Sequence, residues 1–429
     1  MMNRTNMRGT PARLSGALLL GASALMAVIS MIAAGEQSGP PKGGPTVEEQ
    51  AWLKHGFTEA QRQSIRDVFR WGMDQKYVPG GSLLLIHRGE TVMREGFGVA
   101  DIETKEPFTV DAPCRIASVT KPHTATLMAM LVEEGKLSWD DPVDKYLPRF
   151  ANVTVRGKGP ASRPPMVREL LSHTAGFAGQ KAIRSGQWRI QRSGTLAAAV
   201  DDITSQGLAA EPGKGFVYTG MGYMVAARIA EVVTGKEFGA LMKERLLASI
   251  GANTATFSCS ASEELKARLP SVYERQDGRL VKSDTAGRGE ESVAFPNPAG
   301  GLISTLDDLG RFFLLHRNRG MAGGAKLIAP ESLRALYRTQ PATGRAGYGL
   351  GFNILRTDAQ GEGVRVRHTG GSGTWAMLDF ENDLILVLLT QVPQTPTEPF
   401  RLRVVKAVMA VFAPEDQGNP DAETTGREE

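Results

Sequence analysis

Cysteine is scarce in this chain, which contains two in 429 residues. Cys114 and Cys259 lie far apart and form no disulfide framework of the kind that small secreted domains use. Cys114 lies in an apolar stretch, so we expect it to be a buried free thiol rather than half of a pair. The six histidines are scattered, with no His-Glu-x-x-His pattern and no cysteine–histidine cluster. The sequence therefore predicts no metal site.

An excess of charge of one sign is also missing. The formal net charge is +4, but Arg4, Arg8 and Arg13 fall within residues 1–35, which contain no acids. Removing these three from the 50 basic residues leaves 47 against 46 acidic ones. A nearly neutral domain has no electrostatic surface for nucleic acid, so we expect no nucleic-acid partner.

One long hydrophobic run is present, near the N-terminus. The three arginines precede an uncharged apolar stretch over residues 14–34, and Ala33-Ala34-Gly35 provides small residues at a cleavage spacing. The run is about 20 residues long, close to a membrane span, so an uncleaved anchor stays open beside a cleaved signal peptide. In both cases residues 1–35 predict an extracytoplasmic protein, periplasmic or secreted, with residues 14–34 as the candidate membrane anchor.

The rest of the chain predicts a linker, one large domain and a tail. Residues 36–57 are rich in Gly, Pro and polar groups, which is typical of a linker. Residues 58–412 predict one large folded domain, with a helical lobe at roughly 125–290. Residues 413–429 are polar and acidic, and we expect them to be disordered.

Strand patterns occupy both ends of this domain and helical patterns its middle. A capping box at Thr58 and Gln61 opens a first helix, and a hairpin with its turn at Arg88-Gly89 follows. Short apolar runs separated by Gly, Asn and Asp predict an antiparallel sheet from Tyr348 onward. The main later helices are expected at 167–172, 197–205, 221–234, 238–249, 305–317 and about 399–412. The predicted fold class is α/β (α+β type): an antiparallel sheet from both chain ends, flanked by helices, with an inserted mainly helical lobe.

Ser118-Val119-Thr120-Lys121 is the pattern that most strongly suggests chemistry. An extended segment from Cys114 to Ala117 leads into a helix expected to begin near Ser118. Residues three apart share a helix face, so the Lys121 amine should lie beside the Ser118 hydroxyl. A serine becomes a strong nucleophile when a neighbouring base takes its proton. The bare pattern also fits a helix cap followed by a solvated lysine, so further motifs must decide.

Further motifs follow in a consistent order along the chain. They are VPGGSLLLIHRG at 78–89, GFGVAD at 96–101, RIASVTK at 115–121, LLSHTAGF at 170–177, NPAGGLIST at 297–305, YGLGF at 348–352 and HTGG at 368–371. Together they resemble the class C branch of the serine β-lactamase and penicillin-binding-protein superfamily, which also contains D-stereospecific peptidases and esterases. The resemblance runs from about Val78 to Val411 and implies a β-lactamase/transpeptidase-like fold.

The resemblance implies catalytic roles for three residues. Ser118 matches the nucleophile, Lys121 its lysine partner, and Tyr218 the tyrosine that shares proton transfer with that lysine. A phenol ordinarily ionises near pH 10, so a catalytic tyrosine needs positive charge nearby, which Lys121 can supply. Tyr218 could instead be a loop aromatic that anchors the following helix, and Tyr223 on that helix is expected to be packing.

The HTGG motif resembles the strand that faces the nucleophile. His368, Thr369 and Gly370 are the expected substrate-binding residues, and the N–H groups of Ser118 and Gly371 the expected oxyanion hole. His368 could contact a substrate carboxylate or polarise the tyrosine, and Gly370 would let substrate lie against the strand.

Two positions depart from the family pattern. Gly220 stands where an asparagine often holds the substrate amide, and His368 stands where many members have lysine. A glycine makes no side-chain hydrogen bond, and an imidazole is largely neutral at pH 7. Both changes point away from an efficient β-lactamase and leave the acyl-transfer residues in place.

Other candidate residues are expected to be structural. We expect His173 to shape a loop by hydrogen bonding and His123 to face away from Lys121. Asp307 and Asp308 have the positions of first-turn acids in a capped helix. Trp375 fits either a pocket wall or the core.

The sequence thus predicts an extracytoplasmic serine hydrolase that acts through an acyl-enzyme and requires no cofactor. Its substrate would be a β-lactam, a D-amino acid peptide derived from the cell wall, or a small ester. The alternatives are a carboxylesterase of the same fold and a catalytically weak binding or scaffold protein. The sequence does not predict the oligomeric state.

Overall fold

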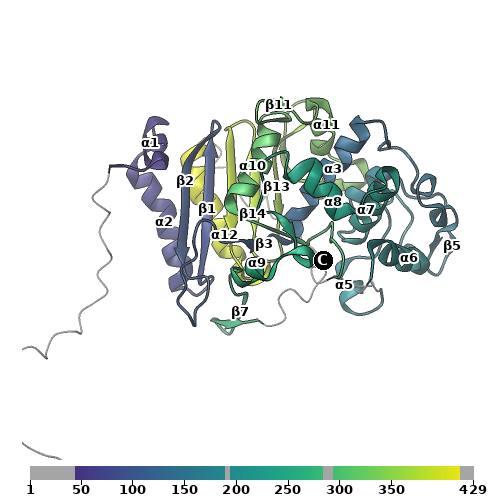
Figure 1. The fold of residues 1–429 in the computed structure, drawn as a ribbon, viewed down its shortest axis with the longest axis horizontal. Coiled ribbons are helices and arrows are strands. Elements are labelled where there is room, and N and C mark those ends of the chain that lie inside the picture. Colours follow the sequence, from purple (N-terminus) through teal and green to yellow (C-terminus); the bar gives the residue numbers. More distant parts are fainter. Residues whose placement is uncertain (1–43, 189–193, 284–292, 416–429) are drawn as a thin grey trace, which may run out of the picture. The chain divides into compact units, whose positions relative to one another are not determined.

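A six-stranded antiparallel sheet is the largest element of the fold (Figure 1). The structure, a computed structural model, describes residues 44–188, 194–283 and 293–415. Strands from the two ends of the domain lie side by side in the order β12-β13-β14-β15-β1-β2, which confirms the predicted architecture. The strands are β1 (Gly80–His87), β2 (Glu90–Gly98), β12 (Asn353–Thr357), β13 (Gly363–Thr369), β14 (Trp375–Asp379) and β15 (Leu384–Leu389).

The central strands are apolar throughout because the sheet separates two hydrophobic cores. In β1, Leu84 and Ile86 belong to one core, and Leu83 and Leu85 to the other. Successive side chains of a strand point to opposite faces, so a strand covered on both faces needs a continuous apolar run. The hairpin turn at Arg88-Gly89 has positive φ angles of 52° and 81°, as predicted for a tight two-residue connection.

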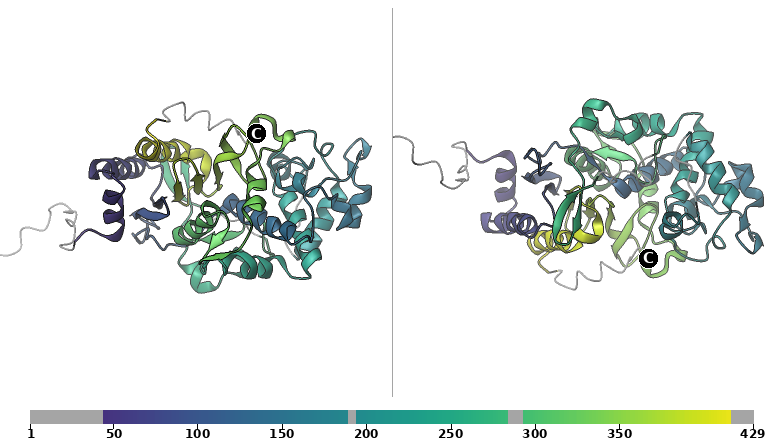
Figure 2. Two further views of the ribbon diagram at one scale, coloured as in Figure 1. Left: turned by 90° about the horizontal axis from the view of Figure 1, so that it is seen from above. Right: turned by 90° about the horizontal axis from the view of Figure 1, so that it is seen from below.

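Helices cover both faces of the sheet. α2 (Glu59–Asp74) and α12 (Gln394–Phe412) pack together on one face of the sheet, and α1 (Val47–Lys54) lies on the same side. α10 (Leu306–Arg317) lies on the other face, against β1 and β15. Figure 2 shows the purple N-terminal helices beside the yellow C-terminal helix.

The helical lobe lies beyond the sheet, at the right in Figure 1. Short strands β3 (Cys114–Arg115), β9 (Leu302–Ser304) and β6 (Thr256–Phe257) form a small sheet of their own. The remaining helices of the fold are α3 (Thr120–Glu133), α4 (Val167–Leu171), α5 (Gln180–Arg184), α6 (Leu196–Gln206), α7 (Met221–Thr234), α8 (Phe238–Met242), α9 (Glu263–Ala267) and α11 (Pro330–Arg334). Three two-stranded pairs complete the fold: β4 (Thr154–Val155) with β5 (Gly159–Pro160), β7 (Tyr273–Gln276) with β8 (Arg279–Lys282), and β10 (Met321–Ala322) with β11 (Ala325–Lys326).

The predicted linker over residues 36–57 was too long, because α1 forms within it. Thr46 and Glu49 make a capping box, and the buried Trp52 packs edge-on against Phe412 at 5.8 Å between ring centroids. A single buried tryptophan gives an eight-residue helix no clear apolar periodicity, so the sequence pattern did not reveal it.

Both predicted terminal segments lie largely outside the described residues. These are the export segment 1–35 and residues 416–429 of the expected tail. Among the helices that the structure does describe, none combines the length and the apolar composition needed to span a bilayer.

Five buried histidines make the stability of this domain dependent on pH. Burial is the main cause that lowers their pKa values: to about 4 for His87 and His123, to about 3 for His316 and His368, and well below the usual value for His173. Each stays neutral in the fold and takes up a proton on unfolding below pH ~6.5. Their contribution to stability is therefore complete above pH ~6.5 and is lost as the pH falls toward 3–4.

We expect the free energy of unfolding to drop by up to about 2 kcal/mol per histidine between pH 7.5 and pH 5. Urea unfolding followed by circular dichroism at pH 7.5, 6 and 5 measures this drop. Equal unfolding midpoints at pH 7.5 and pH 5 would contradict it.

Candidate active site

Ser118 lies in a strained turn between β3 and α3. The helix α3 begins at Thr120, and Ser118 belongs to the preceding 3₁₀ turn η1 (Ala117–Val119). Ala117 has a φ of +45°, which is unfavourable for a residue with a Cβ. The Thr120 hydroxyl holds this turn, because it donates to the Ala117 carbonyl at 2.7 Å and accepts the Leu302 N–H at 3.1 Å. The turn presents Ser118 half-buried.

Lys121 is buried beside the proposed nucleophile. Its Nζ lies 2.9 Å from Ser118 Oγ and donates to the Ala299 carbonyl at 2.8 Å. The residue is 1% exposed, which rules out the alternative of a solvated lysine after a helix cap. Asn297 Oδ1 accepts the Ala299 N–H at 2.9 Å and so shapes the loop that provides this carbonyl.

Tyr218 lies on the other side of the lysine. Its ring centroid is 4.7 Å from Lys121 Nζ, and the residue is half-buried just before α7. Tyr223 is also near, at 5.5 Å, but it is fully buried and donates to the Leu171 carbonyl at 2.7 Å. Burial raises the pKa of Tyr223 well above its usual value, so this phenol stays neutral. The structure thus brings Ser118, Lys121 and Tyr218 together and leaves Tyr223 as packing, as expected.

The end of β13 lies against the nucleophile turn. β12 pairs with β13 only as far as Arg367, so the last residues of the strand extend beyond this neighbour. A Cβ on Gly370 would lie 2.4 Å from the Ile116 carbonyl oxygen. A glycine is required here because two backbone segments approach closely, which differs from the predicted reason of making room for substrate.

Gly371 differs from Gly370 in being exposed. A Cβ at Gly371 would meet no atom within 4 Å, so the space beside it is open. Among the described residues, no acceptor takes the Gly371 N–H. This N–H is therefore available to a ligand, which is what an oxyanion hole with the Ser118 N–H would need.

His368 faces the protein interior, and its predicted contact with substrate is corrected accordingly. The residue is 2% exposed. Its Nδ1 lies 2.8 Å from the Thr369 carbonyl and must donate to it, so Nε2 accepts the Tyr348 hydroxyl at 3.0 Å. Burial, together with the nearby Lys121 charge, lowers the pKa of His368 to about 3. The imidazole is thus neutral, and both of its nitrogens are engaged within the protein.

Tyr348 ties β13 to the helix that carries the lysine. Its segment continues to Gly351, where φ is +85° and a Cβ would lie 2.5 Å from Ala125 Cβ and 3.2 Å from the Lys121 carbonyl. The Tyr348–His368 hydrogen bond joins the YGLGF segment to β13, and the close approach at Gly351 joins the same segment to α3. The motif was recognised in the sequence, but no role was predicted for Tyr348.

Gln391 and Ser372 position the approach to the nucleophile, and sequence reasoning missed both. The Gln391 side chain accepts the Arg115 N–H at 3.3 Å and donates to the Arg115 carbonyl at 3.2 Å. Ser372 Oγ donates to the same carbonyl at 2.6 Å. A side chain that bonds to a distant backbone group has no recognisable sequence motif, so Gln391 could not be predicted. Ser372 directly follows the HTGG motif, and this neighbourhood was the only sign of its role.

His173 has the structural role that was expected. Its Nδ1 accepts the Thr219 N–H at 3.2 Å, its φ is +61°, and its ring lies 4.4 Å from that of Tyr218. Burial, followed by the Lys121 charge, lowers its pKa. His173 therefore supports the loop that carries Tyr218 as a neutral imidazole.

The remaining candidates are also structural. His123 stacks on Phe312 at 3.7 Å between ring centroids. Asp307 pairs with Arg94 at 2.8 Å in the first turn of α10. Trp375 is 2% exposed within the core on the side of α2 and α12, which decides between the two alternatives in favour of core.

Neither cysteine is paired. Cys114 is buried and Cys259 exposed, and burial raises the pKa of the Cys114 thiol. Within residues 44–188, 194–283 and 293–415, no group of three or more His, Cys, Asp or Glu could hold a metal ion.

The Tyr348→Phe substitution tests the link between β13 and α3. We expect it to lower the free energy of unfolding by about 1–3 kcal/mol, because it leaves the buried His368 Nε2 without a donor. Urea unfolding at pH 7.5 measures the change. Tyr77→Phe is the matched control, since this partly exposed tyrosine lies outside the site, and its effect should stay within about 0.5 kcal/mol. Equal effects of the two substitutions would refute the role of Tyr348.

Comparison with known proteins agrees with this geometry. The family model described as Beta-lactamase matches residues 65–410. The chain is 26% identical over 368 residues to Protein Rv1367c of Mycobacterium tuberculosis, covering 78% of this chain and 90% of that protein. It is 26% identical over 391 residues to a putative D-alanyl-D-alanine carboxypeptidase of Escherichia coli, covering 82% and 87% of the two chains.

A solved structure shows the same fold. EstCE1, a hydrolase with promiscuous acyltransferase activity, superposes with a TM-score of 0.70 at 21% identity, over 82% of this chain and 98% of that one. The family match and these relatives support a serine hydrolase. A family model that covers most of the described domain, on a fold with this strand order, shows that the chain belongs to the Beta-lactamase family.

Proposed function

We propose that this protein hydrolyses acyl compounds through a covalent intermediate on Ser118. The observation that carries the proposal is the buried Lys121 amine at 2.9 Å from Ser118 Oγ. A desolvated amine has no water shell to hold its proton, so its neutral form is a suitable base for the serine. Tyr218, whose ring centroid lies 4.7 Å from the same amine, supplies the second proton-transfer group.

In the acylation step, Ser118 Oγ forms a bond to the substrate carbonyl carbon as its proton passes to neutral Lys121. The negative charge on the carbonyl oxygen is stabilised by the N–H groups of Ser118 and Gly371. The bond to the leaving group then breaks, and the leaving group takes, through Tyr218, the proton that Lys121 holds, which makes Lys121 neutral again. In the second step water gives a proton to Lys121 and attacks the acyl carbon. The bond between this carbon and Ser118 Oγ breaks, Oγ takes the proton back, and the carboxylic acid is released.

Small uncharged esters are the substrates that the site favours. Gly220 has no side chain to hold a substrate amide, and the neutral, internally bonded His368 offers no positive charge to a substrate carboxylate. An alkoxide or phenoxide leaves more readily than an amine, so an ester needs less help from such groups.

A D-alanyl peptidase is the second candidate. It is favoured by relatives named as a carboxypeptidase and, in Amycolatopsis lactamdurans, as penicillin-binding protein 4, which is 28% identical over 292 residues.

The covalent step can be followed directly by intact-protein mass spectrometry. With a p-nitrophenyl ester, and with benzylpenicillin if the site accepts amides, we expect a mass increase that Ser118→Ala abolishes. Faster turnover of short esters than of any penicillin would support the esterase, and a persistent penicillin adduct would support the peptidase. Undiminished hydrolysis by a folded Ser118→Ala variant would refute the mechanism.

Tyr218 and Tyr223 provide a matched pair of substitutions. We expect Tyr218→Phe to lower kcat by about 10²–10⁴-fold, the range for loss of a general acid–base group. Tyr223→Phe, also near Lys121, should keep kcat within about threefold of the parent, because its hydroxyl serves packing. Steady-state ester hydrolysis measures both, and a larger loss in Tyr223→Phe would reverse the assignment.

We also propose that the protein acts outside the cytoplasm. The support is the arginine-flanked apolar run over residues 14–34. Fractionation of cells and N-terminal sequencing of the purified protein test this location, and recovery of the intact chain in the cytoplasm would refute it.

A further inference from the structure

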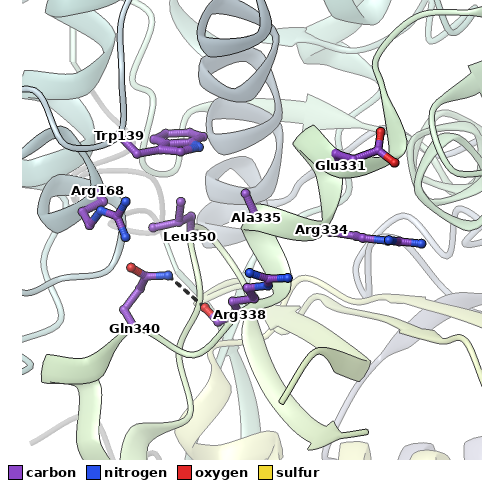
Figure 3. A pocket seen from close by; sticks show the side chains of 8 residues that line it. All are labelled: Trp139, Arg168, Glu331, Arg334, Ala335, Arg338, Gln340 and Leu350. Carbon is purple, nitrogen blue, oxygen red and sulfur yellow. Dashed lines mark hydrogen bonds between the residues drawn. The ribbon is translucent and has the colours of Figure 1, made fainter. Parts of the chain in front are cut away.

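A cavity of about 360 Å³ lies among α4, α11 and the loop after α3 (Figure 3). None of Ser118, Lys121 and Tyr218 lines it. Its volume is within the range of small-molecule sites.

Positive charge predominates around this cavity. Arg168, Arg334 and Arg338 line it, against one acid, Glu331. Within the described part of the chain, Arg338 is exposed and makes no ion pair. The positive charge of Arg338 is therefore available to an anion bound in the cavity.

The other two arginines are only partly compensated. Arg334 lies 3.6 Å from Glu362, and the same carboxylate also lies 3.7 Å from Arg319. Arg168 pairs through one terminal nitrogen with Asp140 at 2.8 Å, while its Nε is buried and meets no acceptor among the described residues. A guanidinium held in this way can still donate to a bound oxyanion.

A buried amide in the cavity wall has an unused acceptor. Gln340 is 7% exposed, and its Nε2 donates to the Arg338 carbonyl at 3.0 Å, which defines the orientation of the amide. Its Oε1 is buried and has no donor in the described structure. Buried polar atoms usually have partners, so this oxygen suits a ligand with a hydroxyl or N–H group.

An apolar surface lies beside these polar groups. In Figure 3 the Trp139 ring lies over Leu350, with Arg168 and Gln340 on the same side of the cavity. Trp139 is half-buried and Leu350 buried. A planar or apolar ligand body can pack against this indole.

We propose that this cavity binds a small organic anion, a carboxylate or phosphate joined to an aromatic or apolar body, as an effector of the active site. The wall of the cavity is continuous with the segment that supports catalysis. The backbone N–H of Gln340 donates to the backbone carbonyl of Tyr348 at 3.0 Å, and the Tyr348 hydroxyl donates to His368. Leu350 precedes Gly351, which lies against the Lys121 carbonyl. A ligand that moves Leu350 or Gln340 therefore moves the support of the lysine.

Phenyl phosphate is a suitable probe, with phenol and inorganic phosphate as partial probes. Isothermal titration calorimetry of the full chain should show phenyl phosphate binding at least tenfold more tightly than either partial probe. Arg338→Gln should weaken binding at least fivefold. Arg149→Gln, which removes another exposed arginine, one that lies 3.4 Å from Asp201 and does not line the cavity, should leave it unchanged. Absence of binding at millimolar concentration, or equal affinity in Arg338→Gln, would overturn the site.

The effector role has its own measurement. Phenyl phosphate should change the rate of p-nitrophenyl acetate hydrolysis at least twofold in the parent and in Arg149→Gln, and not in Arg338→Gln. Binding without any change in rate would overturn the effector role. This role rests on the proposed hydrolase function, whereas binding measured on Ser118→Ala does not, so failure of the two proposals can be told apart.

Discussion

The candidate site depends on one buried contact, between Lys121 Nζ and Ser118 Oγ. A lysine 1% exposed is costly unless polar groups replace its water, and the Ala299 carbonyl supplies one of them. The surrounding backbone is built to hold this arrangement. The left-handed Ala117, the Thr120 hydroxyl and the bonds from Gln391 and Ser372 to Arg115 all constrain the few residues before the serine. The position of Ser118 relative to Lys121 is thus determined by several hydrogen bonds to the backbone before the serine.

The neighbourhood of the lysine is otherwise made of neutral groups. His173 and His368 are uncharged because they are buried, and Tyr223 keeps its proton for the same reason. In the proposed mechanism Lys121 becomes positively charged when it takes the Ser118 proton, and Tyr218 then responds to this charge. His368, being neutral, therefore adds no second positive charge beside Lys121.

Local patterns in the sequence predicted most of the fold. The continuous apolar run of β1, the Arg88-Gly89 turn and the capping box of Thr58 and Gln61 each depend on neighbouring residues, and each is found as predicted. The proximity of Ser118 and Lys121 was predictable from their spacing, although the helix begins at Thr120 and the turn before it presents the serine. Features that depend on distant residues were not predictable. The burial of α1 depends on Trp52 meeting Phe412, the inward orientation of His368 depends on Tyr348, and the Ala299 carbonyl has no side-chain signature.

The pairing of the first strand with the last has a consequence for biogenesis. Ser82 of β1 lies opposite Leu389 of β15, so one edge of the N-terminal hairpin has no partner until nearly the whole domain has left the ribosome. An apolar strand with an open edge is a site for aggregation, and contacts of such long sequence separation form slowly. The edge of β1 that pairs with β15 therefore stays open from the synthesis of the N-terminal hairpin until β15 has been made.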